Sequence, residues 1–273
     1  MPECDPLQSM LTFEMLDDVL FQPENEQDGT LAGATIFQIG PLVELAYTSP
    51  QRLKNLIAKQ DTFETRALSK ILNATPISYG KGNVSTSPSK VEFFCPPQTN
   101  EEFEREEWIA FELRLENAGK KAGLPAIFAK ELTGTFGEMV SNLFDHSERP
   151  DTGIVGYRWG EKEFEYIVAD QGIGMLNSLR QHQDYADLID AEDALLTALR
   201  EGESRYGREA KRGRGFKTLI LNIAGRSSCL RFRTGDRSHV IDGMSAKPTR
   251  TSFTCVHYQG FLISVSCLSD ANP

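Results

Sequence analysis

Two residues that could take part in catalysis stand four positions apart between Lys130 and Ser147. Drawn as a helix at about 100° per residue, this stretch places Glu138 and Asn142 on one narrow polar stripe, away from its apolar face. A carboxylate can take a proton from water, and an amide oxygen can bind Mg²⁺ without adding charge. The solvated side of any amphipathic helix also gives such a stripe, so the pair alone leaves both interpretations open.

A second stretch, Glu165 to Met175, has the pattern of an apolar strand that ends in Asp170. Gly172 and Gly174 follow at alternate positions, where they allow a positive φ angle and a close approach of the backbone. A carboxylate at a strand end can accept a hydrogen bond from an exocyclic amine such as that of adenine, and the glycines leave room for a flat base. An ordinary turn could have the same sequence.

A third stretch, Arg205 to Lys217, is basic in a chain whose formal net charge is -10. Gly213 and Gly215 stand before an expected helix, where backbone N–H groups and the positive helix end could hold phosphates. A solvated loop would have a similar composition. The sequence contains no P-loop pattern, no complete dinucleotide fingerprint, no HExxH, no GxSxG and no Cys/His cluster with zinc spacing.

The composition limits the class of protein. The chain has 273 residues, of which 40% are hydrophobic and 25% charged, as in ordinary globular proteins. Its acidic excess disfavours nucleic acid as a partner, because a phosphate backbone would be repelled. No apolar run reaches the roughly 20 residues of a membrane helix, the N-terminus lacks a signal-peptide pattern, and the scattered cysteines indicate reduced thiols. We expect a cytoplasmic protein that does not contact a membrane.

The elements that must position these residues are clearest after residue 100. We expect helices from Thr99 to Gly119 and from Pro125 to His146, and a strand pair over 152–160 and 163–170. Further helices are expected at 191–202 and 215–225, followed by strands at 229–235, 238–243, 251–258 and 261–268. This order predicts an α+β fold, with helices on one face of a mixed or antiparallel sheet. Before residue 100, a helix from Ser49 to Leu72 and a short strand at 91–95 are expected.

Taken in order, the segments Glu138 to Ser147, Asp170 to Met175 and Gly213 to Lys217 resemble the GHKL superfamily of ATP-binding domains. Gyrase, the ninety-kilodalton heat-shock chaperone, histidine kinases and MutL belong to this superfamily. The resemblance covers roughly residues 105–270 and implies the Bergerat ATP-binding fold, a two-layer α/β sandwich with helices over a mixed, mostly antiparallel sheet. Residues 101–273 would form this domain, with a lid at about 176–212, and residues 1–100 would be a regulatory or partner-binding extension.

The resemblance also implies roles for single residues. Glu138 would be the general base, Asn142 would bind Mg²⁺, and Asp170 would hold the adenine amine of ATP. The remaining contacts would come from Gly172, Gly174 and Met175 at the base and from Gly213, Arg214, Gly215 and Lys217 at the phosphates. The chain departs from the family at Lys217, which replaces a frequent glycine. It also lacks the closing Gly-Thr pattern, for which Gly260-Phe261 is the best equivalent and Thr251-Ser252-Phe253 the other candidate.

Three functions remain open at this point. The first is an ATPase in which MgATP closes the lid and hydrolysis reopens it, changing how a protein partner binds. The second is an anti-sigma-type serine/threonine kinase, in which Glu138 deprotonates a hydroxyl instead of water. The third is a non-catalytic ATP-binding or scaffold module. Residues 1–145 contain no histidine, which argues against a complete sensor kinase, and the frequent dimerisation of the family makes a homodimer a further expectation.

Overall fold

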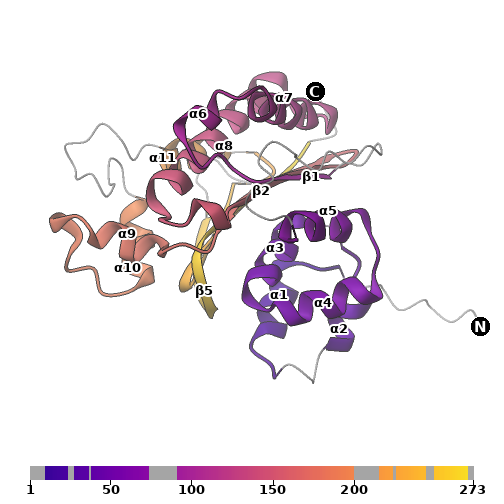
Figure 1. Cartoon of the computed structure of the whole chain (residues 1–273), viewed down its shortest axis with the longest axis horizontal. Coiled ribbons are helices and arrows are strands. Elements are labelled where there is room, and N and C mark those ends of the chain that lie inside the picture. Colours follow the sequence, from indigo (N-terminus) through magenta and orange to yellow (C-terminus); the bar gives the residue numbers. More distant parts are fainter. Residues whose placement is uncertain are drawn as a thin grey trace, which may run out of the picture.

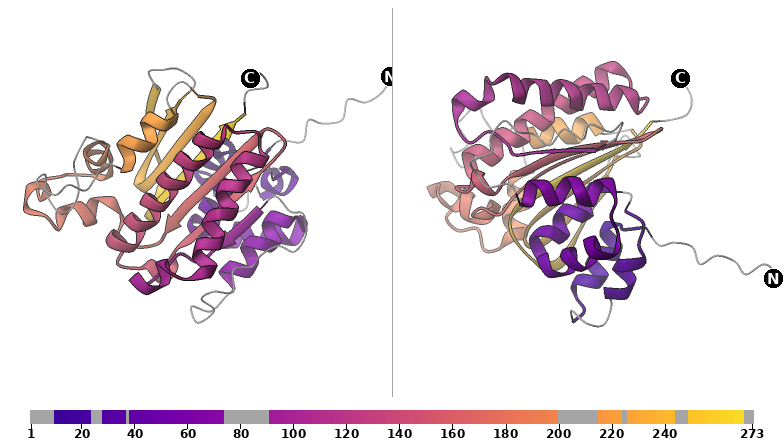
Figure 2. Two further views of the ribbon diagram at one scale, coloured as in Figure 1. Left: turned by 90° about the horizontal axis from the view of Figure 1, so that it is seen from above. Right: turned by 45° about the vertical axis from the view of Figure 1, so that its right-hand side comes forward.

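The computed structural model describes residues 10–23, 28–36, 38–73, 91–199, 215–223, 226–243 and 249–269. Within these ranges the strands form one five-stranded sheet in the order β1-β2-β3-β5-β4, and neighbouring strands pair antiparallel throughout. The predicted α+β class is confirmed. Helices lie on both faces of this sheet, so that it is the middle one of three layers (Figures 1 and 2).

The strands are β1 (Val91–Phe94), β2 (Ile154–Trp159), β3 (Glu163–Asp170), β4 (Ser228–Asp242) and β5 (Thr249–Leu268). The predicted β2–β3 hairpin is confirmed, with Trp159 opposite Phe164 and a backbone hydrogen bond from Gly160 to Glu163 closing the turn. β1 pairs with β2 at one edge of the sheet. The sheet therefore begins before residue 101, where the sequence places the start of its domain.

The strand β4 reverses its direction within its own length. Fifteen residues of straight strand would span roughly 50 Å, yet the N–H of Gly243 donates to the carbonyl of Ser228 over 2.9 Å. The register with β5 shifts at Gly235, which has a φ of 56°. The two strands expected at 229–235 and 238–243 are thus the two arms of β4, and those expected at 251–258 and 261–268 are parts of β5.

On one face of the sheet lie the helices α7 (Glu106–Lys121), α8 (Ala126–His146) and α11 (Gly215–Ile223). Their shared core contains the predicted apolar side of α8, with Phe136, Met139 and Leu143 buried against the sheet. The helix expected from Thr99 to Gly119 is wrong in one respect, because α6 (Asn100–Phe103) is separate from α7. The aromatic contacts of Phe103 with Trp108 and Phe144 accompany this break.

The other face of the sheet is covered by the N-terminal helices, which we call the N-terminal unit. They are α1 (Phe13–Leu20), α2 (Asp28–Gly33), α3 (Ile39–Thr48), α4 (Pro50–Lys59) and α5 (Phe63–Leu72). This corrects the expectation of helices on one face only. Successive residues of β3 explain it, since Tyr166 and Val168 are buried in the first core while Ile167 and Ala169 are buried in the second.

The single helix expected from Ser49 to Leu72 is also wrong, because the structure divides it into α4 and α5. Gln60 ends α4, and Thr62 begins α5 with a capping box. In this box Thr62 Oγ1 accepts from the N–H of Thr65, and Thr65 Oγ1 accepts from the N–H of Thr62. Among the helices described, none has both the length and the apolar character needed to cross a membrane.

Buried charges join the N-terminal unit to the sheet. Arg231 of β4 donates to both carboxylate oxygens of Asp17 in α1, over 2.7 and 2.9 Å. Arg233 Nε donates to Glu44 of α3 over 2.6 Å, and Arg231 reaches the same carboxylate at 3.2 Å. Two guanidinium groups and two carboxylates therefore neutralise one another out of contact with most of the solvent, which is the condition under which buried charges are tolerated. We call these four residues the buried ion cluster.

Candidate functional site

The end of α8 and the end of β3 meet at Asp170. Ser147 Oγ donates to Asp170 Oδ1 over 3.0 Å, and the N–H of Gly172 donates to the same oxygen over 2.7 Å. The N–H of Ile173 donates in turn to the carbonyl of Ser147 over 3.0 Å. The first two sequence segments, which predict a common site, are therefore in direct contact.

Glycine is required at both positions predicted in the second segment. A Cβ atom on Gly172 would lie 2.1 Å from the carbonyl oxygen of Ser147, a distance that no side chain can tolerate. Gly174 has a φ of 73°, and its added Cβ would lie 3.2 Å from Gly260 O. Both glycines permit a close approach of backbone, that of Ser147 after α8 at Gly172 and that of Gly260 in β5 at Gly174.

The carboxylate of Asp170 is buried, with 2% of the residue exposed. Burial raises its pKa to about 6, while the hydrogen bonds from Gly172 and Ser147 and the backbone of Phe261 oppose this rise. At neutral pH the group is ionised but poorly solvated. An additional hydrogen-bond donor would therefore stabilise it more than it would stabilise a carboxylate in water.

Two threonine hydroxyls hold the segment 171–175, which we call the glycine loop. Thr152 Oγ1 accepts from the N–H of Gln171 over 3.0 Å, and Thr234 Oγ1 accepts from the N–H of Met175 over 3.1 Å. Thr234 Oγ1 also donates to the carbonyl of Gly260. Sequence reasoning missed both threonines, because a single threonine far away along the chain carries no spacing signal.

Gly260 lies at this site, as the predicted equivalent of the family's closing glycine would. It has a φ of 94°, and an added Cβ would lie 2.2 Å from the carbonyl oxygen of Asp170. The other candidate, Thr251 to Phe253, pairs instead with residues 238–240 in the distal arm of β4. Of the two candidates, the structure brings only Gly260 against Asp170.

The first part of the polar stripe of α8, at Glu131, lies near the end of α11. Glu131, on the same stripe as Glu138, approaches Arg226 to 3.5 Å just beyond the end of α11, and the two helices are in contact. Glu138 is exposed and Asn142 is partly buried, while Met139 and Leu143 point into the core. The stripe residues Glu138 and Asn142 are thus outside the core.

Part of the third segment lies outside the described residues. Gly213 and Arg214 fall there, as do positions 200–212 of the predicted lid. Gly215 is the first residue of α11, and Lys217 belongs to its first turn. Positions 174–198 of the chain form α9 (Gly174–Arg180), a short 3-10 turn and α10 (Ala191–Ala198), which share a small core of Leu179, Tyr185 and Ala194. Met175 packs against both this core and the main one.

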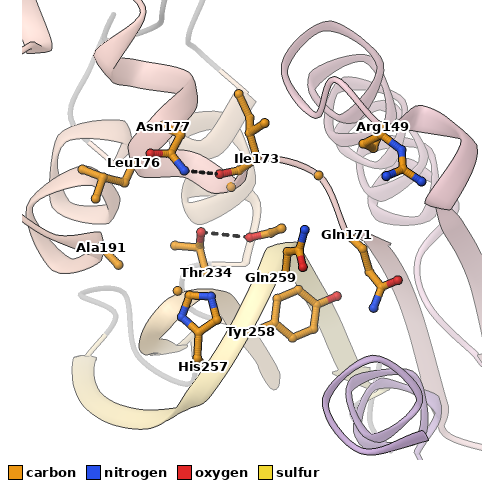
Figure 3. A pocket seen from close by; sticks show the side chains of 14 residues that line it. Arg149, Gln171, Ile173, Leu176, Asn177, Ala191, Thr234, His257, Tyr258 and Gln259 are labelled. Atoms are coloured by element: carbon orange, nitrogen blue, oxygen red, sulfur yellow. Dashed lines mark hydrogen bonds between the residues drawn. The ribbon is translucent and has the colours of Figure 1, made fainter.

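A cavity of about 430 Å³ lies beside the glycine loop (Figure 3). Its lining includes Gly172 and Gly174 of the loop, together with Thr234 of β4 and Tyr258 and Gly260 of β5. Neither Asp170 nor the stripe residues Glu138 and Asn142 line it. The cavity therefore belongs to the surroundings of the loop and is separate from the polar stripe of α8.

Within the described ranges, no group of three or more His, Cys, Asp or Glu side chains is arranged to hold a metal ion. The predicted metal ligand is the single amide of Asn142. Magnesium in nucleotide sites is commonly held by one or two protein groups together with water and substrate phosphates, so one amide fits that mode of binding. No protein-family model matches the chain, and a search of curated proteins returns no match.

Proposed function

We propose that this chain is a magnesium-dependent ATP-binding protein of the GHKL type, which hydrolyses ATP and thereby changes how it binds a protein partner. The observation that carries the proposal is the hydrogen-bonded junction of Ser147, Asp170 and Gly172. It joins, in the folded chain, two segments whose residues and order resemble that superfamily. Under this proposal the sheet with α7, α8 and α11 is a Bergerat fold, and the N-terminal unit is an addition to it.

The adenine would be held at Asp170. Its exocyclic amine would donate to the carboxylate, which is buried and therefore gains more from a donor than an exposed one would. Gly172 and Gly174 would shape the base pocket indirectly, because they let the loop lie close against Ser147 and Gly260. An acceptor at this position favours adenine, which carries an amine at C6, over guanine, which carries a carbonyl oxygen there.

The phosphates and Mg²⁺ would lie between α8 and α11. Asn142 would supply an amide oxygen to the metal from the polar stripe of α8. The N-terminus of α11, which begins at Gly215, carries the partial positive charge that attracts phosphate. Gly213, Arg214 and Lys217 would add further contacts. Glu138, one turn before Asn142, would orient and deprotonate the water that attacks the terminal phosphate.

Phosphotransfer to a serine or threonine of a partner protein is the second candidate. Glu138 is exposed, so a hydroxyl group presented by another protein could reach it as readily as water could. The chemistry at the phosphate would be the same, with the partner's hydroxyl in place of water. Binding of ATP without either reaction would identify the chain as a non-catalytic module.

Thermal unfolding with ATP, ADP and GTP, each with and without Mg²⁺, tests the proposal. ATP at about 100 times its Kd should stabilise the fold by roughly 2.7 kcal/mol, and GTP should stabilise it less. Asp170→Asn keeps an oxygen that can accept from Ser147 and Gly172, so the variant should fold. Its amide NH₂ would face the adenine amine with a donor instead of an acceptor, so the stabilisation by ATP should be lost. Asp61→Asn, in the exposed turn between α4 and α5, is the matched control. The proposal fails if the wild-type chain shows no ATP binding, or if Asp170→Asn binds ATP as tightly as the wild type.

A further inference from the structure

The first end of the glycine loop is connected to the N-terminal unit through one tyrosine. Tyr47 Oη, near the end of α3, donates to the carbonyl of Thr152 over 2.5 Å. Thr152 uses its hydroxyl to accept from the N–H of Gln171 and to donate to the carbonyl of Arg149. Tyr47 therefore fixes the backbone of the residue whose side chain holds the beginning of the loop.

The second end of the loop is connected to the same helix through a buried ion pair. Glu44 of α3 accepts from Arg233 Nε over 2.6 Å, and both side chains are fully buried. The next residue of β4 is Thr234, which accepts from the N–H of Met175. Because neighbouring residues of a strand point to opposite faces, Arg233 faces the N-terminal unit while Thr234 faces the loop.

Glu44 and Tyr47 are three residues apart in a helix, so they lie on one side of α3. From this side Tyr47 contacts Thr152, and Glu44 contacts Arg233, the neighbour of Thr234. The two threonines hold the two ends of the loop. The ring of Tyr47 also meets the ring of Tyr258 edge-on, with centroids 6.0 Å apart, and Tyr258 lines the cavity beside Gly172 and Gly174. Burial, and after it the charge of Asp170, raises the pKa of Tyr47 well above its ordinary value, so its hydroxyl remains a neutral donor.

The position of α3 on the sheet is itself fixed at the other end of the helix. Glu165 of β3 accepts from the N–H groups of Ile39 and Gly40 over 2.8 and 2.7 Å, and this carboxylate occupies the positive end of the helix. A Cβ on Gly40 would lie 2.5 Å from the ring of Phe13 and 2.7 Å from Ser264 Oγ. The helix is therefore held against the sheet at both ends, so that Glu44 and Tyr47 have defined positions.

We propose that α3 positions the glycine loop for ATP, and that Tyr47 and Glu44 are the positioning residues through which the N-terminal unit controls nucleotide affinity. The inference rests on the proposed function, since it names the regulation of the same site. A displacement of α3 would release Thr152 and Arg233 together, and with them both ends of the loop. By thermodynamic linkage, ATP must then strengthen the docking of the N-terminal unit by the same factor by which docking strengthens ATP binding.

Tyr47→Phe is the direct test, because it removes the hydroxyl and keeps the ring. Loss of one hydrogen bond should weaken ATP binding roughly three- to tenfold. Tyr157→Phe is the matched control, since Tyr157 also donates a buried hydroxyl, to Glu92 over 2.6 Å, but between β2 and β1. Both variants should lose thermal stability, and only Tyr47→Phe should lose ATP affinity.

Thr152→Val and Thr152→Ser give an independent test. Its readout is the rescue of ATP affinity by the variant that keeps the hydroxyl, which a purely structural role would not affect. Thr152→Val removes the acceptor for Gln171 and should weaken ATP binding, while Thr152→Ser should restore it. In the wild-type chain, ATP should also slow hydrogen exchange of the amides of α3. If the wild type binds ATP but Tyr47→Phe binds it as tightly as Tyr157→Phe does, the positioning role is refuted and the proposed function stands. If the wild type does not bind ATP, the proposed function has failed first.

Discussion

Ser147 donates a hydrogen bond of 3.0 Å to the carboxylate of Asp170. The two residues are separated by the whole β2–β3 hairpin, yet their contact fixes the end of α8 against the end of β3. Because Gly172 and Ile173 bond to the same two residues, the glycine loop has one geometry that is set by α8. A substitution that disturbs the loop should therefore also disturb the junction between α8 and β3.

Gly172→Ala should break this junction. The added Cβ would lie 2.1 Å from Ser147 O, and a backbone atom cannot move away by a change of rotamer. We expect a loss of roughly 1–3 kcal/mol of stability together with loss of ATP binding. Gly134→Ala is the control, because Gly134 lies in α8 with open space around it and alanine there should stabilise the helix by about 0.5–1 kcal/mol. Denaturant unfolding measures both, and equal stability of the two variants would contradict the described contact.

The affinity for adenosine should depend on the ionisation of Asp170. The pKa of this carboxyl is raised to about 6 by burial, and a donated hydrogen bond from the adenine amine favours the ionised form. Affinity should therefore be constant well above pH 6 and fall as the pH decreases through that value. Adenosine is the better probe because a terminal phosphate titrates near the same pH. Calorimetric titration between pH 5 and 8 measures the trend, and an affinity that rises toward pH 5 would exclude Asp170 as the acceptor.

Glu138→Gln should separate chemistry from binding. The amide keeps the size of the side chain but cannot accept a proton, so phosphate release at saturating ATP should fall by about 10²- to 10⁴-fold while the Kd for ATP changes little. Glu131→Gln, on the same stripe of α8, should leave the rate unchanged. A wild-type chain that transfers label to a partner protein and releases little phosphate would favour the kinase. Full turnover in Glu138→Gln would remove this residue from the mechanism.

The stability of the docked α3 should depend on pH through Glu165. Burial raises the pKa of this carboxyl from 4.5 to about 7, although the N–H groups of Ile39 and Gly40 oppose the rise. The folded pKa lies above the unfolded one, so the contribution to stability is complete below about pH 4.5 and is lost as the pH rises through 7. The change amounts to roughly 3 kcal/mol. Glu165→Gln cannot titrate, so the difference in unfolding free energy between it and the wild type should shift by this amount between pH 4.5 and 8. A difference in unfolding free energy that is independent of pH would contradict the raised pKa of Glu165.

Local patterns in the sequence predict the parts of the site that depend on nearby residues. The apolar side of α8, the β2–β3 hairpin and the glycines of the loop all follow from helix periodicity, strand alternation and backbone conformation. Each of these is decided by residues within one or two turns along the chain. The expected boundaries fail at Phe103, where aromatic contacts with Trp108 and Phe144 accompany the break, and after Gln60, where the capping box of Thr62 and Thr65 starts a new helix.

Local patterns do not predict the second helical layer, because its contacts join distant parts of the chain. Ile39 meets Glu165 across 126 residues, and Asp17 meets Arg231 across 214. One local signal did exist, since residues 166–169 in the second half of β3 are apolar at successive positions, which is typical of a strand buried on both faces. Thr152 and Thr234 had no such signal, and only the three-dimensional structure shows what they hold.

The buried ion cluster has a consequence for how the chain can be shortened. A fragment starting at the sheet would retain Arg231 and Arg233 and lose both of the acids that neutralise them. It would expose Ile167, Ala169 and Leu262 beside two cationic groups, a surface that attracts acidic and apolar molecules without discrimination. A shortened chain that precipitates would then report the loss of its neutralising layer rather than a failure of the remaining sheet and helices to fold.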